Sequence, residues 1–298
     1  MPILNFGSCC IDHVYSVPHF AAPGETLACS NYQVYPGGKG LNQSIAMKAA
    51  GAKVNHAGKV GQDGRWLLNL MASRNIDVSR IKVDADPTGH ANIQVTPEGE
   101  NSIVLSSGAN RTITKSDIDE ALEDAKPGEF ILLQNEISAS DYLIKRACEK
   151  GMRVVFNAAP MSADVRAFPL EAIELLVINK IEGFELTKKT APEDIIAILS
   201  SRLTSTNILL TLGSAGSIYA GKGDSISQPA MKVKAIDTTA AGDTYVGFFL
   251  AGYSSGKSVA ECLAMATSAA GLCVTRAGAA TSIPSLYELE KLPGYAND

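Results

Sequence analysis

The chain has 298 residues, 46% hydrophobic and 19% charged, and is therefore long and apolar enough for a folded α/β protein. Its net charge of -5 is spread along the chain without a basic stripe, so we expect no nucleic-acid partner. No window reaches the roughly 18 apolar residues of a membrane helix, and the N-terminus does not resemble a signal peptide. The sequence thus predicts a cytoplasmic protein without membrane contact.

The cysteines support the same compartment. They form no Cys-x-x-Cys pair and no regular framework, and several lie in apolar runs. We therefore expect reduced, buried thiols at all six positions, which are Cys9, Cys10, Cys29, Cys148, Cys262 and Cys273.

Short β-type runs alternate with helical stretches along most of the chain. The pattern predicts strands at 3–7, 130–134 and 152–156, and helices at 41–50 and from a cap at Ser138 to near Gly151. Two successive helices are predicted at 242–253 and 258–274. This alternation is typical of an α/β fold with a central, mainly parallel sheet flanked by helices.

One region departs from the alternation. Residues 89–107 read as a hairpin around a turn at 97–100, and with the run at 32–35 they predict a small separate sheet. No internal repeat, low-complexity tract or linker divides the chain. We expect a single domain over 1–298, with the small sheet formed approximately by 14–35 and 88–107.

The strongest local motif is the run of small residues Asp237-Thr238-Thr239-Ala240-Ala241-Gly242-Asp243, which leads directly into an apolar helix. Exposed N–H groups at a helix start form an anion site that suits a phosphate. Asp243, ionised at neutral pH, could take the proton from a hydroxyl that attacks this phosphate. Locally, a favourable charge in the first helical turn explains Asp243 equally well.

Two further motifs contain polar groups near predicted helix starts. Pro36-Gly37-Gly38-Lys39-Gly40-Leu41-Asn42 is a dense glycine cluster, which permits unusual backbone conformations but could be a plain turn. Asn179-x-x-Glu182 follows an apolar run, and oxygen ligands at a strand's carboxyl end suit magnesium. A helix start capped by Asn179 is the more common explanation of that second motif.

In their order, these motifs resemble the ribokinase-like carbohydrate kinase family. The matching residues are Gly38-Lys39-Gly40-x-Asn42, Asn179-x-x-Glu182, Thr211-Leu212-Gly213-Ser214-x-Gly216 and Asp237-Thr-x-Ala-Ala-Gly-Asp243. The resemblance extends from Gly7 to about Pro284, and four motifs in order are far more specific than one. It implies ATP-dependent phosphorylation of a sugar, a three-layer fold, and a small β-sheet lid that covers the sugar and often forms a dimer contact.

The resemblance also implies roles for individual residues. Asp243 would be the base, beside an anion hole formed by Ala240, Ala241 and Gly242. The sugar would contact Asp12, Gly38, Lys39, Asn42, Glu136 and Asp243. ATP and Mg²⁺ would use Asn179 and Glu182, and the nucleotide would also contact Thr211, Gly213, Ser214, Gly216, Gly242 and Thr267. A monovalent cation, K⁺, would lie at Asp237, Thr239, Cys273, Arg276, Gly278 and Ser282.

Two departures from the family pattern leave the sugar open. Cys10 stands where ribokinases usually carry an asparagine, two residues before Asp12, and Lys180 stands where many relatives have a second glutamate. A thiol is a weak hydrogen-bond partner, so the contact at Cys10 would be lost or replaced. Ribose is the first candidate, and related pentoses and hexoses follow.

Three other functions compete with sugar phosphorylation. A nucleoside kinase of the same fold would stack an aromatic side chain on the base, and near the glycine cluster only Tyr32 and Tyr35 offer one. A sugar-binding regulator without activity is disfavoured by the intact Asp243 and Asn179. A dinucleotide-dependent oxidoreductase should carry G-x-G-x-x-G after the first strand, and that motif is missing from the sequence there.

Overall fold

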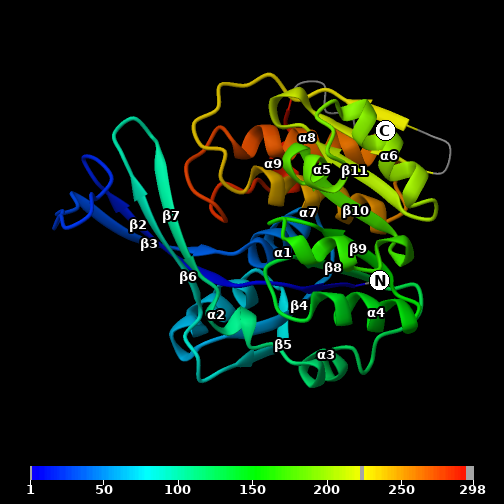
Figure 1. Ribbon diagram of the computed structural model, residues 1–298, viewed down its shortest axis with the longest axis horizontal. Helices are drawn as coiled ribbons and strands as arrows, with labels where there is room; N and C mark the ends of the chain where they lie inside the picture. Colours follow the sequence, from blue (N-terminus) through cyan, green and yellow to red (C-terminus); the bar gives the residue numbers. More distant parts are fainter. Residues whose placement is uncertain (1, 222–224, 293–298) are drawn as a thin grey trace.

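The computed structural model describes residues 2–221 and 225–292, which form two β-sheets (Figure 1). The larger sheet has the strand order β13-β12-β11-β10-β9-β8-β1-β4-β5. Every pair from β11 to β5 is parallel, and β12 and β13 add an antiparallel edge. Its strands are β1 (Ile3–Phe6), β4 (Val54–Val60), β5 (Asp77–Val83), β8 (Phe130–Gln134), β9 (Arg153–Asn157), β10 (Leu175–Asn179), β11 (Asn207–Thr211), β12 (Ser217–Ala220) and β13 (Ser225–Gln228).

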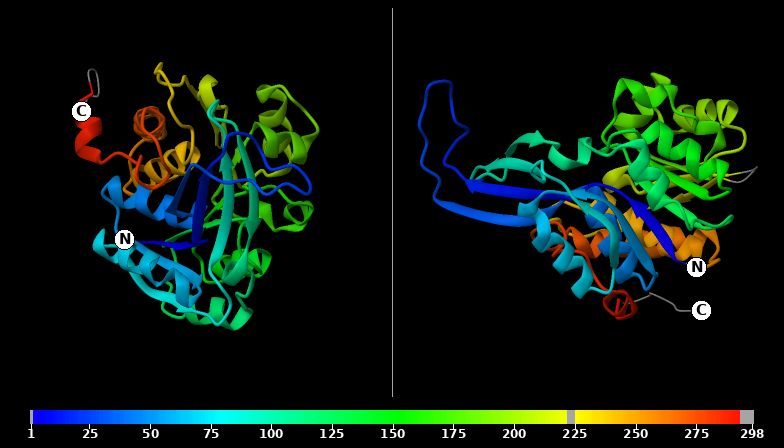
Figure 2. Two further views of the ribbon diagram at one scale, coloured as in Figure 1. Left: turned by 90° about the vertical axis from the view of Figure 1, so that its left-hand side faces the viewer. Right: turned by 90° about the horizontal axis from the view of Figure 1, so that it is seen from below.

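Helices cover both faces of this sheet, as Figure 2 shows. Residues of α1, α2, α7 and α8 pack on one face and residues of α3, α4 and α6 on the other, so the central strands are apolar on both sides. The expected three-layer α/β fold is confirmed. The helices are α1 (Lys39–Ala49), α2 (Arg65–Ser73), α3 (Lys115–Ala121), α4 (Ser140–Glu149), α5 (Lys180–Thr187), α6 (Pro192–Arg202), α7 (Ala241–Ser254), α8 (Val259–Cys273) and α9 (Leu286–Glu290).

The small sheet projects from this body (Figures 1 and 2). It consists of β3 (Asn31–Gly37), β2 (Cys10–Ser16), β6 (Gly89–Val95) and β7 (Asn101–Ser106), in that order. β6 and β7 form the predicted hairpin, and β2 pairs with β6 in parallel. The edge strand β7 is exposed along its whole length.

One predicted helix start is wrong. Ser138 does not cap α4, because its hydroxyl donates a hydrogen bond to the carbonyl oxygen of Ile113 at 2.7 Å. The helix begins two residues later at Ser140, after Ala139 in a left-handed conformation with φ 55°. In the described parts of the chain, no helix is both long and apolar enough to cross a membrane.

A close approach between β1 and α1 sets the start of α1. A Cβ atom on Gly40 would lie 2.4 Å from the backbone nitrogen of Ser8, and one on Gly7 would lie 2.7 Å from Cα of Gly40. Both positions therefore require glycine. The first turn of α1 is thereby held against the carboxyl end of β1, at the centre of the sheet.

Candidate active site

Asp243 lies in the first turn of α7, where its carboxylate contacts α1. Oδ2 accepts a hydrogen bond from Asn42 Nδ2 at 3.0 Å, and Oδ1 accepts one from Gln43 Nε2 at 2.9 Å. Burial raises the pKa of Asp243 to about 6, although the nearby Lys39 ammonium and these two amides act in the opposite direction. The carboxylate is thus fixed in orientation and more basic than an ordinary aspartate.

The residues assigned to the sugar lie together beside Asp243. Glu136, which follows β8, accepts hydrogen bonds from Ser8 Oγ at 2.5 Å and from the backbone N–H of Lys39 at 3.0 Å. Lys39 Nζ lies 3.4 Å from the other oxygen of Glu136. Burial, followed by the charge of Glu136, raises the pKa of Asp12 to about 6, against the opposing charge of Lys39. These groups surround one polar region at the base of the small sheet.

Two backbone and amide features complete this region. Gly38 has φ 93°, and a Cβ there would lie 2.9 Å from the backbone nitrogen of Cys10, so the glycine is required. Asn42 Oδ1 is buried and, among the described residues, has no hydrogen-bond partner. A buried acceptor without a partner is costly, and a ligand hydroxyl would satisfy it.

Cys10 is held by a residue that the sequence did not single out. Asn110 is 1% exposed, donates from Nδ2 to Cys9 O at 2.9 Å, and approaches Cys10 Sγ at 3.5 Å. Its Oδ1 accepts the N–H of Cys9 at 3.1 Å. Burial raises the pKa of the Cys10 thiol well above its usual range. The thiol is therefore neutral and leaves a weakly polar surface at this position.

Asn179 caps α5, and the cap also fixes Glu182. Asn179 Oδ1 accepts the backbone N–H groups of Ile181 and Glu182 at 2.8 and 3.0 Å. Glu182 accepts in return from Asn179 N at 2.7 Å and from Nδ2 at 2.9 Å. Burial raises the pKa of Glu182, while Asn179 and Lys39 act against this rise. The capping interpretation is confirmed, and both residues of the cap line a pocket of about 220 Å³ together with Lys39 and Asp243.

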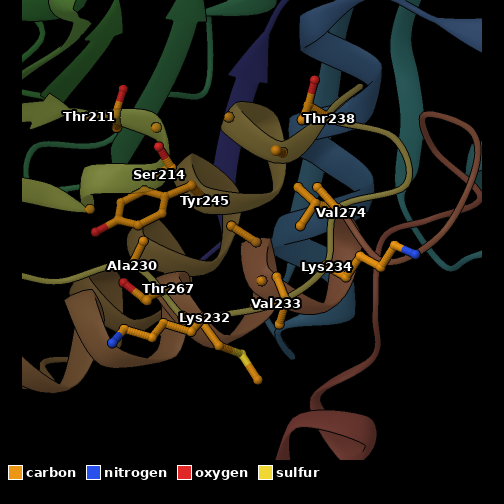
Figure 3. A pocket seen from close by; sticks show the side chains of 18 residues that line it. Thr211, Ser214, Ala230, Lys232, Val233, Lys234, Thr238, Tyr245, Thr267 and Val274 are labelled. Atoms are coloured by element: carbon orange, nitrogen blue, oxygen red, sulfur yellow. The ribbon is translucent and has the colours of Figure 1, made fainter. Parts of the chain in front are cut away.

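A larger pocket of about 840 Å³ adjoins this small one (Figure 3). The two pockets share Thr211 and Gly242, so Asp243 lies at their junction. Six of the eight residues that the resemblance assigns to ATP line the larger pocket, namely Thr211, Gly213, Ser214, Gly216, Gly242 and Thr267, whereas Asn179 and Glu182 line the small one. The sequence did not single out residues 230–235 or Tyr245, which also line it. Residues 230–235 have no regular secondary structure and hence no periodic pattern.

The residues assigned to a monovalent cation come from two segments, 237–239 and 273–282, which hydrogen bonds hold together. Asp237 accepts from the backbone N–H groups of Thr239 and Gly278, both at 2.9 Å. Cys273 Sγ lies 3.1 Å from Ser282 Oγ and 3.8 Å from the carbonyl oxygen of Thr239. These five residues therefore lie together. Arg276 differs, because its guanidinium pairs with Glu288 at 2.7 Å. The contact of Arg276 with Cys273 is made by the backbone, where the N–H of Arg276 donates to the carbonyl oxygen of Cys273.

The turn before α7 presents backbone N–H groups next to Asp243. Ala240 is in a left-handed conformation with φ 59°, and α7 starts at Ala241. The N–H of Ala241 donates to Thr238 O at 3.2 Å. The next N–H groups, those of Gly242 and Asp243, belong to the first helical turn, where no intrahelical acceptor exists. Such groups can bind an anion where the two pockets adjoin, since Gly242 lines both of them.

The family of the chain follows from its similarity to known proteins. The pattern of the pfkB family carbohydrate kinases matches residues 3–286. A Haemophilus influenzae protein named ribokinase is 36% identical over 294 residues and covers 95% of both chains. A Salmonella typhi protein named deoxyribokinase is 30% identical over 301 residues and covers 98% of both. A solved structure of Arabidopsis thaliana ribokinase complexed with ribose and ATP has a TM-score of 0.87 at 28% identity, and the match covers 98% of this chain and 99% of that one. This chain belongs to the pfkB family of carbohydrate kinases and is a ribokinase-like carbohydrate kinase.

Proposed function

We propose that this kinase transfers the γ-phosphoryl group of ATP to a primary hydroxyl of a small sugar, with ribose as the first candidate. The observation that carries the proposal is the place of Asp243, between the sugar-side cluster of Asp12, Lys39 and Glu136 and the large pocket. The ribokinase names of the relatives, and the ribose and ATP in the Arabidopsis structure, support the same substrates.

In the proposed reaction Asp243 is the general base. The sugar hydroxyl gives its proton to Asp243 while its oxygen attacks the γ-phosphorus, the bond from this phosphorus to the β–γ bridging oxygen breaks, and ADP leaves. Lys39 and the N–H groups of Ala240, Gly242 and Asp243 would stabilise the charge that develops on the transferred group. The N–H of Ala241 would join them only by releasing its hydrogen bond to Thr238 O. A raised pKa makes Asp243 a better proton acceptor than an ordinary aspartate.

The proposed metal sites use residues with the expected donor chemistry. Glu182 and Asn179 supply oxygen atoms beside the small pocket, and Mg²⁺ suits one or two carboxylates together with phosphates and water. When bound, Mg²⁺ would neutralise phosphate charge during transfer. The groups that would hold K⁺ are the Asp237 carboxylate and the backbone or hydroxyl oxygens of Thr239, Cys273, Arg276, Gly278 and Ser282.

We further propose one domain over 1–298, in which the small sheet, approximately 14–35 and 88–107, covers the sugar and forms a homodimer in the cytoplasm. Asp12 pairs across this sheet with Ala91, which pairs with Leu105, so Leu105 lies on the same face as Asp12. Ile103 shares that face, because alternate residues of a strand point the same way. Ile103 and Leu105 are 54% and 55% exposed, and a second copy would cover them.

The sugar itself is tested by an ADP-release assay with MgATP across ribose, 2-deoxyribose, other pentoses and hexoses, keto-sugars and nucleosides, with and without K⁺. We expect turnover with ribose or a close relative and stimulation by K⁺. The neutral thiol of Cys10 makes 2-deoxyribose an informative comparison, as does the relative named deoxyribokinase. Preference for nucleosides would favour a nucleoside kinase, and no turnover with any compound would contradict the proposal.

A further inference from the structure

A row of buried carboxamides connects the centre of the large sheet to Asp243. Its members are Asn5 on β1, Gln134 on β8 and Gln43 on α1, and each is 0% exposed. Gln134 Nε2 donates to Asn5 Oδ1 at 3.0 Å and to Gln43 Oε1 at 2.7 Å. Gln43 Nε2 then donates to Asp243 Oδ1 at 2.9 Å. The row therefore ends on the carboxylate of the proposed base.

The direction of every hydrogen bond in this row follows from one backbone atom. Asn5 Nδ2 donates to Gly40 O at 2.7 Å, and a carbonyl oxygen can only accept, so the amide nitrogen of Asn5 must face Gly40. Asn5 Oδ1 consequently faces Gln134, which must donate from Nε2. Because Gln134 also donates to Gln43 Oε1, the amide nitrogen of Gln43 must face Asp243. The backbone of α1 thus fixes which group is presented to the carboxylate.

The orientation of Gln134 lowers the free energy of unfolding, so good packing is not the reason for it. Both N–H groups of Gln134 are used, and its Oε1 is buried without a hydrogen-bond partner among the described residues. Room for this carboxamide also needs Gly7, since a Cβ there would lie 2.3 Å from Gln134 Oε1. Buried polar groups without partners are destabilising, and apolar side chains would fill the same space without this cost.

We propose that Asn5, Gln134 and Gln43 act as a positioning relay, which presents an N–H donor to Asp243 and keeps its carboxylate ionised and fixed for proton transfer. The inference rests on the proposed function of Asp243 as the base. The three amides are positioning residues, since they act through Asp243. Asn42 donates to the other carboxylate oxygen, so both oxygens are held and the carboxylate cannot rotate without losing a bond.

Other charged groups around Asp243 come from three elements and are unchanged by the relay. Lys39 at the start of α1 favours the ionised carboxylate, and Glu136 after β8 opposes it. Glu182 on α5 lines the same small pocket. Removal of the relay therefore changes one neutral hydrogen-bond donor and leaves the charges in place, so its effect can be read from the titration of Asp243.

The test is the pH dependence of kcat at saturating sugar and MgATP for wild type, Gln134→Met and Gln43→Met. Methionine approximates the size and shape of glutamine but cannot donate. We expect the acid limb of both variants to shift upward by about one pH unit, with kcat recovering at high pH and the KM for ATP unchanged. Asn207→Leu, which removes the hydrogen bonds of Asn207 with Glu174 O and Tyr253 at the opposite end of β11, is the matched control and should leave the acid limb in place.

Each outcome decides the inference. If wild type shows no Asp243-dependent sugar phosphorylation, the proposed function fails and the relay fails with it. If wild type is active but the acid limb of the methionine variants coincides with that of wild type, or kcat falls equally at every pH, the relay is overturned while the proposed function stands. If Gln134→Met does not fold, Gln43→Met gives the answer, because it removes the donor directly.

Discussion

The ammonium group of Lys39 faces carboxylates that come from separate elements. Burial lowers its pKa, but the charges of Glu136, Asp243 and Glu182 outweigh burial, so the pKa of Lys39 is raised. The lysine is therefore firmly protonated and offsets part of the cost of burying three acidic groups near one another. It also lines the small pocket together with Asp243 and Glu182.

Asp12 gives a prediction on sugar affinity. Its pKa is raised to about 6, so the carboxylate is ionised above this pH and becomes protonated below it. If the ionised form accepts hydrogen bonds from sugar hydroxyls, the KM for the sugar should rise as pH falls through 6. Sugar KM measured from pH 5 to pH 8 checks this expectation. Asp12→Asn should show a higher KM that changes much less with pH, and an equally steep change in the variant would contradict the assignment.

At the scale of residues, the sequence identified those that belong to motifs and missed those joined only by the fold. Asp243 and Lys39 stand in glycine-rich or small-residue runs that point to a ligand site. Gln43 and Gln134 belong to no such run, and their hydrogen bonds join positions 91 and 200 residues apart, which no local pattern can show. Asn110, 101 residues from Cys9, was missed for the same reason.

At the scale of elements, the start of α5 combines a structural role with a proposed catalytic one. Asn179→Ala removes the cap and should lower the free energy of unfolding by about 1 kcal/mol. Asn179→Ser keeps a hydroxyl that can cap the helix, so its stability should stay near that of wild type. Thermal or urea unfolding of the two variants measures this difference.

Activity of the same pair separates the two roles of Asn179. Serine cannot donate to Glu182 as the carboxamide does, at 2.9 Å, so the carboxylate should be less well held. We expect Asn179→Ser to need a higher Mg²⁺ concentration for half-maximal activity despite its near-normal stability. A Mg²⁺ dependence equal to that of wild type would mean that Asn179 is only a helix cap.

Elements with a clear period were predicted well, and the exceptions have local causes. The strand at 130–134 was predicted with its exact bounds because five successive residues are buried on both faces of a parallel sheet. The predicted start of α4 was wrong because the Ser138 hydroxyl donates to the carbonyl oxygen of Ile113. Capping rules consider only neighbouring residues and cannot predict such a contact. The wall of the large pocket at 230–235 follows no period at all.

At the scale of the whole molecule, the exposed face of the small sheet predicts the oligomeric state. An Ile103→Asp, Leu105→Asp double variant places charges on the face that carries Asp12, and it should be monomeric. Val104→Asp is the matched control, since Val104 is 68% exposed on the opposite face of the same strand and should leave a dimer intact. Sedimentation velocity measures the mass of each, and a monomeric wild type or a dimeric double variant would contradict the lid contact.

The layered architecture followed from the alternation of strands and helices, whereas the strand order did not. β1 lies between β4 and β8, and its pairing partners are distant in sequence, since Ile3 pairs with Val54 on one side and with Phe130 on the other. The pairing of such distant strands cannot be predicted from local sequence patterns. This order is what places Glu136, the glycine cluster and α7 around one site.

The central claim is that Asp243 is the base of a sugar kinase. Its most direct test is the turnover of Asp243→Asn with the best sugar from the substrate panel, together with ATP affinity and thermal stability. Asparagine keeps the shape of the side chain but cannot accept the proton from the hydroxyl. We expect kcat to fall by about 10³-fold, while ATP binding and folding are retained. Turnover within tenfold of wild type would contradict the claim.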